Sequence, residues 1–460
     1  MLCGFVLIVA AIFPRPVPAS QYKLVDLGTL GGENSYAEAI NDSGQVAGRS
    51  DNSIGQTRAF LRKDDTLTDI GGFEDGLSTF SYGINYSGQV VGSAAVKELN
   101  QWGWEEILFH AVLWTDQGIN DLGTLGGKES CAIGIDFFGQ VVGKAQDSNG
   151  NYHAFLWKEN AMTDLGSLPG GNESCANAIN ALQHVAGYSA TSDGNYRAFI
   201  WNKTDGMIDL GTLSGGNESR AHDLNNSGQT VGYSTNGDGC CRAVIWDNTE
   251  IRDLGTLGGD SSEALGMNDA GQVVGRSRTG TDDYHAFIWS GNQMTDLNTL
   301  VAPGSEWILE AAKDINSNGW IVATGGKDYT RRAFLLMPEI RQSIYGKITE
   351  NTLGYSMPVN GVEISITNTE TGVKMVGYTG ENGVFLIPDL PVSTYTVRIS
   401  ADSFMEKILN DVQVSEGADV DISGILALKG PSQGDANGNN KLDISDAVYV
   451  LQVISGIRSR

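Results

Sequence analysis

The sequence is poor in the residues on which several classes of protein depend. Lysine and arginine number 30 against 55 aspartates and glutamates, which gives a net charge of −25 and a pI near 4.5. Such a chain has no basic surface to displace counterions from phosphates, so nucleic-acid binding is disfavoured. The five cysteines and five histidines show no Cys-x-x-Cys or His-rich spacing, which argues against a zinc site. Gly-x-Ser-x-Gly, His-Glu-x-x-His and phosphate-loop motifs are also missing, which weakens the case for an active site.

The apolar run at the start of the chain, Leu2 to Phe13, is too short to span a bilayer as a helix. Pro14 ends it, and the small residues around Val17 to Ala19 then offer a cleavage site. We therefore predict a secretory signal peptide over residues 1–20, no transmembrane segment, and export to the extracellular medium or the cell surface.

What the chain does contain is abundant glycine, 60 residues in 460, and an internal repeat. Each copy opens on an aspartate, and successive openings lie 43, 52, 43, 45, 44 and 43 residues apart. The openings are Asp26, Asp69, Asp121, Asp164, Asp209, Asp253 and Asp296. A period in the low forties is typical of one blade of a β-propeller.

Within a unit, short runs such as AIGI, QVVG and HAFLW are rich in β-branched and aromatic residues and are separated by Gly and Asn turns. This texture predicts four antiparallel strands per unit. The last unit lacks a fourth strand, whereas Leu24 to Leu30 is a surplus copy of that strand at the start. We predict that the surplus strand completes the last sheet and closes a seven-bladed β-propeller of ~43-residue repeats over residues 22–338.

A cation precedes the Ala-Phe or Ala-Val pair of every unit. These cations are Arg58, His110, His153, Arg197, Arg242, His285 and Arg332. In five blades the next opening aspartate follows eleven residues later, which places the two side chains together across a hairpin. We interpret the pair as structural rather than as a ring of cations for an anionic ligand, because a binding site is seldom repeated in every blade.

Cysteine pairing stays open. Cys131 and Cys175 occupy the same position of consecutive units, so an exported protein can either join them or keep both as thiols. A bond between the adjacent Cys240 and Cys241 would be strained.

Departures from the repeat are the best candidates for ligand binding. The largest insertion, residues 97–109, carries Trp102, Trp104, Glu105 and Glu106, which could stack on sugar rings and accept hydrogen bonds from their hydroxyls. The alternative is a loop that packs its own aromatic residues over the neighbouring blade. The same rim carries one acid in the loop of five blades, at Glu33, Glu129, Glu173, Glu218 and Asp260, and no pair among them is singled out for hydrolysis.

The repeat text DLGTLGG, then AxAINxxGQVVG, then HAFLW resembles the HAF repeat, named after triplets such as His153-Ala154-Phe155. The resemblance covers roughly residues 22–338 and implies export but no particular activity.

After Pro338 the period disappears and alternating strands over residues 342–428 predict a separate β-sandwich of about seven strands. Gly346, Pro358 to Val362, Thr379 to Phe385 and Thr394 to Val397 match the motifs of the carboxypeptidase regulatory-like domain. That resemblance implies a spacer or weak binding domain without catalytic residues.

The tail, residues 430–460, contains a twelve-residue loop with oxygen-bearing side chains at positions 1, 3, 5, 9 and 12. Together with the main-chain carbonyl at position 7, this spacing predicts a calcium site. The predicted ligands are Asp435, Asn437, Asn439, Lys441 through its carbonyl, Asp443 and Asp446. The loop runs into a predicted helix capped by Gly456, so the segment resembles the first half of a type I dockerin, which implies Ca²⁺ and a cohesin-bearing scaffold protein as partner.

Two classes of function remain. One is a secreted, non-catalytic protein whose propeller binds a glycan or a protein while its tail docks to cohesin, in the setting of polysaccharide degradation. The other is a dockerin-bearing glycoside hydrolase or polysaccharide lyase with its site on the propeller rim.

Overall fold

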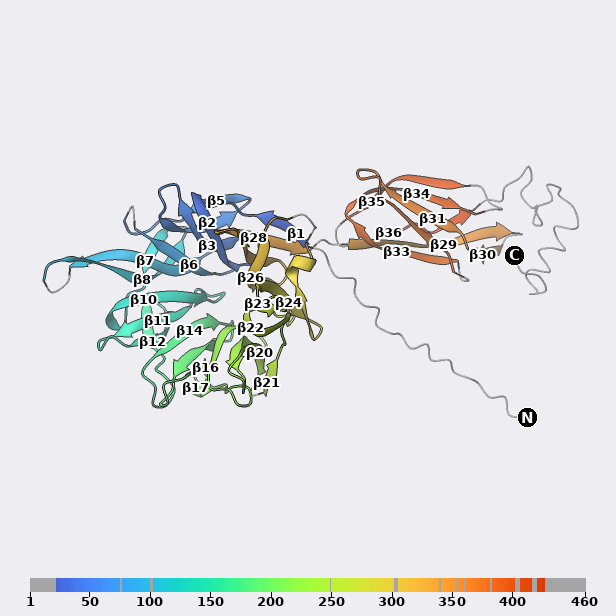
Figure 1. Cartoon of the computed structure of the whole chain (residues 1–460). Helices are drawn as coiled ribbons and strands as arrows, with labels where there is room; N and C mark the ends of the chain where they lie inside the picture. The colour runs from blue at the N-terminus through green and yellow to red at the C-terminus, as the bar shows by residue number, and fades with distance from the viewer. Residues whose placement is uncertain are drawn as a thin grey trace, which may run out of the picture. The chain divides into compact units, whose positions relative to one another are not determined.

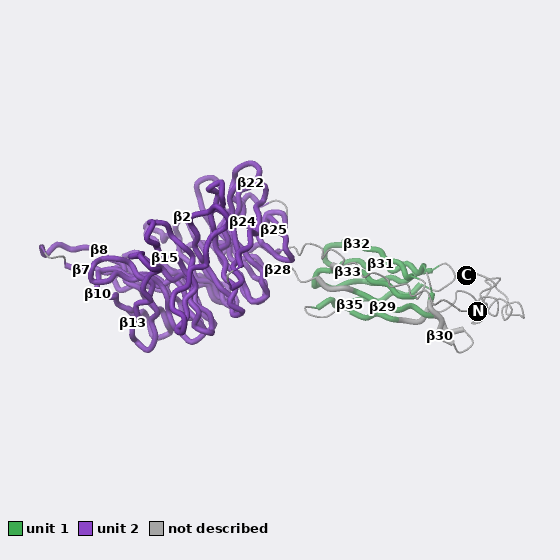
Figure 2. Tube along the Cα trace, turned by 90° about the horizontal axis from the view of Figure 1, so that it is seen from below, with its two compact units in different colours: residues 1–20, 339–460 green, residues 21–338 purple. Residues whose placement is uncertain are grey.

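The computed structural model describes residues 22–426 apart from 75–76, 100–101, 249, 302–304, 339–340, 353–354, 360, 381–382, 402–405 and 416–419. These residues fall into two compact units, Gln21–Pro338 and the chain beyond it (Figure 2). The predicted signal peptide, residues 1–20, and the predicted calcium loop and helix, residues 430–460, lie outside the described residues. The prediction of an all-β chain is confirmed, because the described elements are strands apart from one short 3-10 helix.

In the first unit the described strands form seven four-stranded antiparallel sheets (Figure 1). Six of these sheets use four consecutive strands in chain order, so each repeat folds as one up-and-down sheet. The strands of these six sheets are β2 (Gly31–Ile40), β3 (Val46–Asn52), β4 (Thr57–Lys63), β5 (Thr66–Asp69), β6 (Thr79–Ile84), β7 (Val90–Leu99), β8 (Glu105–Thr115), β9 (Gly118–Asp121), β10 (Gly126–Ile135), β11 (Val141–Asp147), β12 (Tyr152–Lys158), β13 (Ala161–Asp164), β14 (Ser174–Ile179), β15 (Val185–Ala190), β16 (Tyr196–Asn202), β17 (Gly206–Asp209), β18 (Ser219–Leu224), β19 (Thr230–Thr235), β20 (Cys241–Asp247), β21 (Glu250–Asp253), β22 (Gly258–Met267), β23 (Val273–Thr279), β24 (Tyr284–Ser290) and β25 (Gln293–Asp296). The 3-10 helix η1 (Leu297–Thr299) follows them.

The seventh sheet joins the two ends of the array. It has the order β1-β28-β27-β26, in which β1 (Tyr22–Asp26) pairs antiparallel with β28 (Thr330–Pro338). The inner strands are β27 (Ile321–Lys327) and β26 (Ile308–Ile315). The prediction that the N-terminal strand completes the last sheet is therefore confirmed, and the unit is propeller-like.

The cores of this unit lie between neighbouring sheets. The phenylalanine of the Ala-Phe pair is fully buried in several of them, as at Phe60, Phe155 and Phe287. The glycine after Val-Val is also dictated by packing, because a Cβ at Gly143 would lie 2.0 Å from the carbonyl oxygen of Cys131 on the neighbouring strand. These two requirements explain why the same letters recur in each repeat.

The structural interpretation of the repeated cation is confirmed in five blades. Arg58 contacts Asp69 at 2.8 Å, and His110 contacts Asp121 at the same distance. The other three pairs are His153–Asp164, Arg242–Asp253 and His285–Asp296, at 2.8, 3.1 and 2.6 Å. In each the aspartate also accepts the backbone N–H two residues later, so it holds the chain that leaves the blade.

The second unit is a two-sheet sandwich. One sheet has the order β30-β29-β33, with two short strands added to β29, and the other has the order β32-β31-β34-β35. The strands are β29 (Arg341–Thr352), β30 (Tyr355–Pro358), β31 (Glu363–Asn368), β32 (Lys374–Tyr378), β33 (Val384–Pro391), β34 (Ser393–Ser400), β35 (Lys407–Val414), β36 (Val420–Asp421) and β37 (Gly424–Leu426). Its core includes Ile344, Ile364 and Val397, all fully buried. Nine strands are described where about seven were expected.

Candidate ligand-binding channel

The first strands of the seven sheets line a central channel. Each of these strands leads into a hairpin turn that begins with Asn or Asp. Three residues before that Asn or Asp, the strand presents a side chain to a chamber of about 470 Å³. These side chains are Glu38, Tyr82, Ile133, Asn177, His222, Leu265 and Lys313. All seven differ, whereas the residues just before them are alanines in every blade except the second, which has Ser81. The repeat therefore keeps the residues around the chamber nearly the same in every sheet, while the side chains that line the chamber differ.

The charged side chains Glu38, Arg49 and Lys313 of the chamber form one network, and His222 belongs to a second. Glu38 contacts Arg49 at 2.7 Å and Lys313 at 3.6 Å. In the fifth and sixth sheets, Glu263 contacts His222 at 2.9 Å and Arg276 at 2.7 Å. Burial alone would raise the pKa of Glu263, but the hydrogen bond from His222 and the charge of Arg276 outweigh it and lower the pKa to about 2.

Two aspartates in the channel wall have strongly raised pKa values. Burial, followed by the charge of Asp314, raises the pKa of Asp223 to about 7, and burial raises that of Asp314 to about 6. Each carboxylate joins two sheets. Asp223 accepts the N–H of Leu224 and of Met267 in the next sheet, and Asp314 accepts those of Ile315 and Ile40. These bonds give both acids a structural role.

On one side the chamber opens to the rim formed by the loops between second and third strands. A cavity of about 820 Å³ there shares Arg49 and Lys313 with the chamber. Tyr36, Tyr284 and Glu310 are among its lining residues. Arg49 and Arg276 lie over the two tyrosine rings, at 4.6 and 5.1 Å from their centroids. Because these ring faces are already covered by guanidinium groups, this cavity presents charged and polar groups rather than bare aromatic surface.

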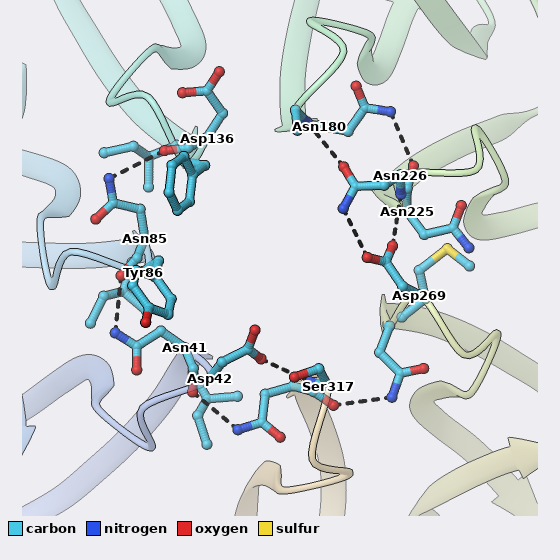
Figure 3. A pocket seen from close by; sticks show the side chains of 18 of the residues that line it. Asn41, Asp42, Asn85, Tyr86, Asp136, Asn180, Asn225, Asn226, Asp269 and Ser317 are labelled. Atoms are coloured by element: carbon cyan, nitrogen blue, oxygen red, sulfur yellow. Dashed lines mark hydrogen bonds between the residues drawn. The ribbon is translucent and has the colours of Figure 1, made fainter.

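On the other side the chamber borders a hollow of about 290 Å³, which is surrounded by the hairpin turns (Figure 3). The apolar residues between the two cavities are Ile40, Ile84, Ile135, Ile179, Leu224, Met267 and Ile315. Each turn begins with Asn, or with Asp136 in the third sheet. In five sheets the side-chain amide donates to the backbone carbonyl of the corresponding residue in the next sheet, at 3.0–3.2 Å. The donors are Asn41, Asn85, Asn180, Asn268 and Asn316. This chain of hydrogen bonds holds the sheets together around the hollow.

The predicted tryptophan insertion is the tip of the long β7–β8 hairpin, which extends beyond its sheet (Figure 1). Trp102 and Trp104 are 73% and 72% exposed. Glu105 is exposed as well, whereas Glu106 contacts Lys128 of the next sheet at 2.6 Å. None of these four residues lines the channel cavities described above. Ligand binding at the hairpin stays a prediction.

Three of the acids on the same rim have partners within their blades, and one of them is Glu218, which accepts a hydrogen bond from the Tyr233 hydroxyl at 2.9 Å. Tyr152 donates its hydroxyl hydrogen bond to Glu129 at 2.6 Å, and Tyr196 donates to Glu173 at 2.8 Å. Cys131 and Cys175 are free thiols in the structure, as are Cys240 and Cys241. Burial raises the pKa of Cys131 to about 12, so this thiol is held in its neutral form.

Sequence reasoning missed the channel lining. Loops of unusual length were the basis of the predicted sites, whereas the chamber is formed by one position inside the first strand of each sheet. The signal was present in the sequence, because aligned repeats keep Ile, Leu or Met two residues after this position and vary at the position itself. An alternating strand presents every second side chain to the same face, so the varied position faces the channel together with the conserved apolar residue two places later.

Comparison with known proteins agrees with this division of the chain. Residues 343–427 match the carboxypeptidase regulatory-like domain, which confirms that prediction for the second unit. No curated protein matches the chain. Among the described residues, no helix is long and apolar enough to cross a membrane.

Several solved structures are similar. The β-propeller domain of the trilobed protease from Pyrococcus furiosus shares 8% identity, with a TM-score of 0.37 over 72% of this chain and 98% of that one. The sialidase of Trypanosoma rangeli shares 10% identity, with a TM-score of 0.32 over 90% and 89% of the two chains. A type II cohesin–X–dockerin complex from Acetivibrio cellulolyticus shares 21% identity, with a TM-score of 0.16 over 24% of this chain and 73% of that one.

Proposed function

We propose that this chain is an exported, non-catalytic binding protein in which a seven-bladed propeller binds a glycan. The carboxypeptidase regulatory-like domain acts as a spacer, and a calcium-binding, dockerin-like tail attaches the protein to a cohesin-bearing scaffold. The setting that suits these parts is the breakdown of polysaccharides outside the cell.

The observation that carries this proposal is the channel. Its frame repeats from blade to blade, while its chamber is lined by seven different side chains. Packing of a repeated fold does not require seven different side chains at equivalent positions. A site that binds a ligand of low symmetry does require different side chains around it. Hydroxyl-rich ligands suit the polar lining, because it combines the Glu38 carboxylate, the Asn177 amide and the Tyr82 hydroxyl, which are all groups that form hydrogen bonds.

The attachment role rests on the tail sequence. Asp435, Asn437, Asn439, Asp443 and Asp446 would hold Ca²⁺ together with the main-chain carbonyl of Lys441. When bound, the ion would fix the loop and so orient the helix that follows it. The hydrophobic residues of that helix would then be presented to a partner surface.

Affinity electrophoresis of the full chain tests the proposal. Gels that contain cellulose derivatives, xylan, mannan, chitosan or pectin are compared with a gel without polysaccharide, with calcium present throughout. We expect retardation in at least one polysaccharide. Equal migration in every gel, supported by the absence of heat in calorimetric titrations with soluble oligosaccharides, would contradict glycan binding.

A second candidate is a polysaccharide-cleaving enzyme. The observation that favours it is Asp223, because a carboxyl group with a pKa of about 7 could act as a general acid. Both of its oxygens accept backbone N–H groups, however, which matches a structural role better. Release of reducing ends that is lost in Asp223→Asn, in a variant that still folds, would favour the enzyme.

A further inference from the structure

In three of the seven sheets the second residue of the hairpin turn joins two sheets. Asp42 accepts the backbone N–H of Ser317 at 2.9 Å, and Asp269 accepts that of Asn226 at 2.8 Å. Asn226 in turn accepts the N–H of Ala181 at 3.1 Å. At this position an aspartate or asparagine therefore stabilises the ring.

In the second and third sheets the same position is aromatic. Tyr86 and Phe137 have no carboxylate or amide oxygen with which to accept the N–H of the preceding turn. The other two turns without such a bond carry the small residues Ala181 and Ser317, whereas Tyr86 and Phe137 place large rings there. Two large rings at a surface turn call for an explanation other than the stability of the fold.

The two rings form one exposed cluster with their neighbours. Tyr86 and Phe137 lie 5.8 Å apart between ring centroids, and Phe137 and Phe138 lie 5.5 Å apart. Their exposed fractions are 59%, 58% and 67%. A contiguous exposed patch of this kind marks a binding surface rather than a folding core. We call Tyr86, Phe137 and Phe138 the aromatic platform.

The platform borders the hollow at the centre of the turns. Figure 3 shows Tyr86 on one side of this hollow and Asp42, Asp269 and Asn226 around its remaining edge. The lining includes three aspartates, many amides and backbone carbonyls, and no lysine, arginine or histidine. Such a lining accepts hydrogen bonds from hydroxyl groups and repels anions.

Resting on the glycan binding proposed above, we infer that the propeller holds a neutral pyranose sugar at this mouth. One face of the sugar, which carries C–H groups, would pack on the aromatic platform. Its hydroxyls would donate to acceptors at the edge of the hollow, which has the volume of a small ligand at about 290 Å³. The site is distinct from the tryptophan hairpin, and it belongs to the rim of short turns rather than to the rim of variable loops.

The repeat itself supplies the variant that tests this inference. Tyr86→Asn combined with Phe137→Asn places asparagine at both positions. Asparagine occurs naturally at the equivalent position of the fifth sheet, where Asn226 joins two sheets. We expect this double variant to melt at the same temperature as the parent chain or higher, which separates loss of binding from loss of fold. Trp102→Ala combined with Trp104→Ala is the matched control, because it removes two exposed aromatic residues elsewhere.

Calorimetric titration of the full chain uses cellohexaose, xylohexaose and mannohexaose as neutral probes and hexagalacturonate as an anionic one. We expect at least one neutral probe to bind, the anionic probe to bind more weakly, and the Tyr86→Asn/Phe137→Asn variant to lose about tenfold in affinity or more. The tryptophan control should keep the parent affinity.

Other outcomes would overturn the inference. Binding that survives in the asparagine variant but is lost in the tryptophan variant would place the glycan on the hairpin, and the proposed function would stand. Sedimentation that shows a dimer of the parent chain, broken by the asparagine variant, would assign the platform to a second copy. Failure of every polysaccharide and oligosaccharide to bind would instead contradict the proposed function itself.

Discussion

The side-chain amide of Asn316 donates a hydrogen bond to the backbone carbonyl of Asn41 at 3.0 Å, although 275 residues separate them in the chain. This bond joins the last sheet to the first at the mouth of the channel. The pairing of β1 with β28 joins the same two ends of the repeat at the outside of the sheet. The ring is therefore closed both at its centre and at its periphery.

Asn316→Asp should destabilise the propeller. The new carboxylate keeps the oxygen that accepts the N–H groups of Asn318 and Trp320, but it cannot donate to Asn41 and sets a charge against a carbonyl. We expect a loss of about 1–3 kcal/mol in the free energy of unfolding, measured in urea. Asn292→Asp, on an exposed turn, is the control for charge and should change stability by less than about 0.5 kcal/mol. Equal stability of the two variants would show that the central bond does not matter.

Asp136→Asn should have the opposite effect, because it supplies the amide that the third sheet lacks. Asp136 is almost fully buried, one of its carboxylate oxygens has no partner, and burial raises its pKa. A raised pKa means that the folded state binds the proton more tightly, so the parent chain loses stability as the pH rises above the ordinary value of 3.8. The Asp136→Asn variant has no ionisable group at this position, so its stability does not fall in this way.

We therefore expect the variant to gain about 1–2 kcal/mol at pH 7 and to lose most of that advantage near pH 3. Unfolding in urea at a series of pH values measures the difference. An advantage that is the same at every pH would mean that Asp136 is ionised at no cost in the fold.

The contribution of the His110–Asp121 ion pair to the stability of the fold should depend on pH. The hydrogen bond with Asp121 raises the pKa of His110 above its ordinary value of 6.5, so the stabilisation is complete below 6.5 and declines as the pH rises through the folded pKa. Asp121→Asn, which keeps an oxygen for the N–H of Gly123, should cost most between about pH 5 and 6.5. Because Asp121 is 40% exposed, screening limits this cost to about 1 kcal/mol.

Asp253→Asn is the matched control for that experiment. Its partner Arg242 keeps its charge throughout this range, so the cost of the substitution should not vary with pH between 5 and 8. Thermal unfolding of both variants over this range makes the comparison. A flat profile for Asp121→Asn as well would contradict a protonated His110.

The repeat made most of the propeller predictable, because seven copies of one text separate what the fold requires from what varies. The strand missing after Leu336 and the surplus strand at Leu24 predicted how the sheets close, and the spacing of Arg58 and Asp69 predicted the ion pairs. Tyr86 and Phe137 were not predicted as a site. Their two turns lie 51 residues apart in the chain, and the packing of the second sheet against the third brings the ring centroids to within 5.8 Å.

Calcium should bind to the tail with the ligands predicted from the sequence. We expect calorimetry of the full chain to show a calcium site that Asp435→Ala abolishes, because the first carboxylate of the loop is removed. Asp421→Ala, in the preceding domain, is the control and should leave the titration unchanged. Equal calcium binding by the parent chain and the Asp435→Ala variant would remove the basis for a dockerin-like tail.

The measurement that tests the central claim most directly follows binding and cleavage in one sample. The full chain is incubated with the polysaccharide that retards it in affinity gels, and bound protein and newly formed reducing ends are both determined over time. The account predicts retained protein with no reducing ends above those of a sample without protein. A steady release of reducing ends, abolished in Asp223→Asn, would contradict it and would make the channel an active site.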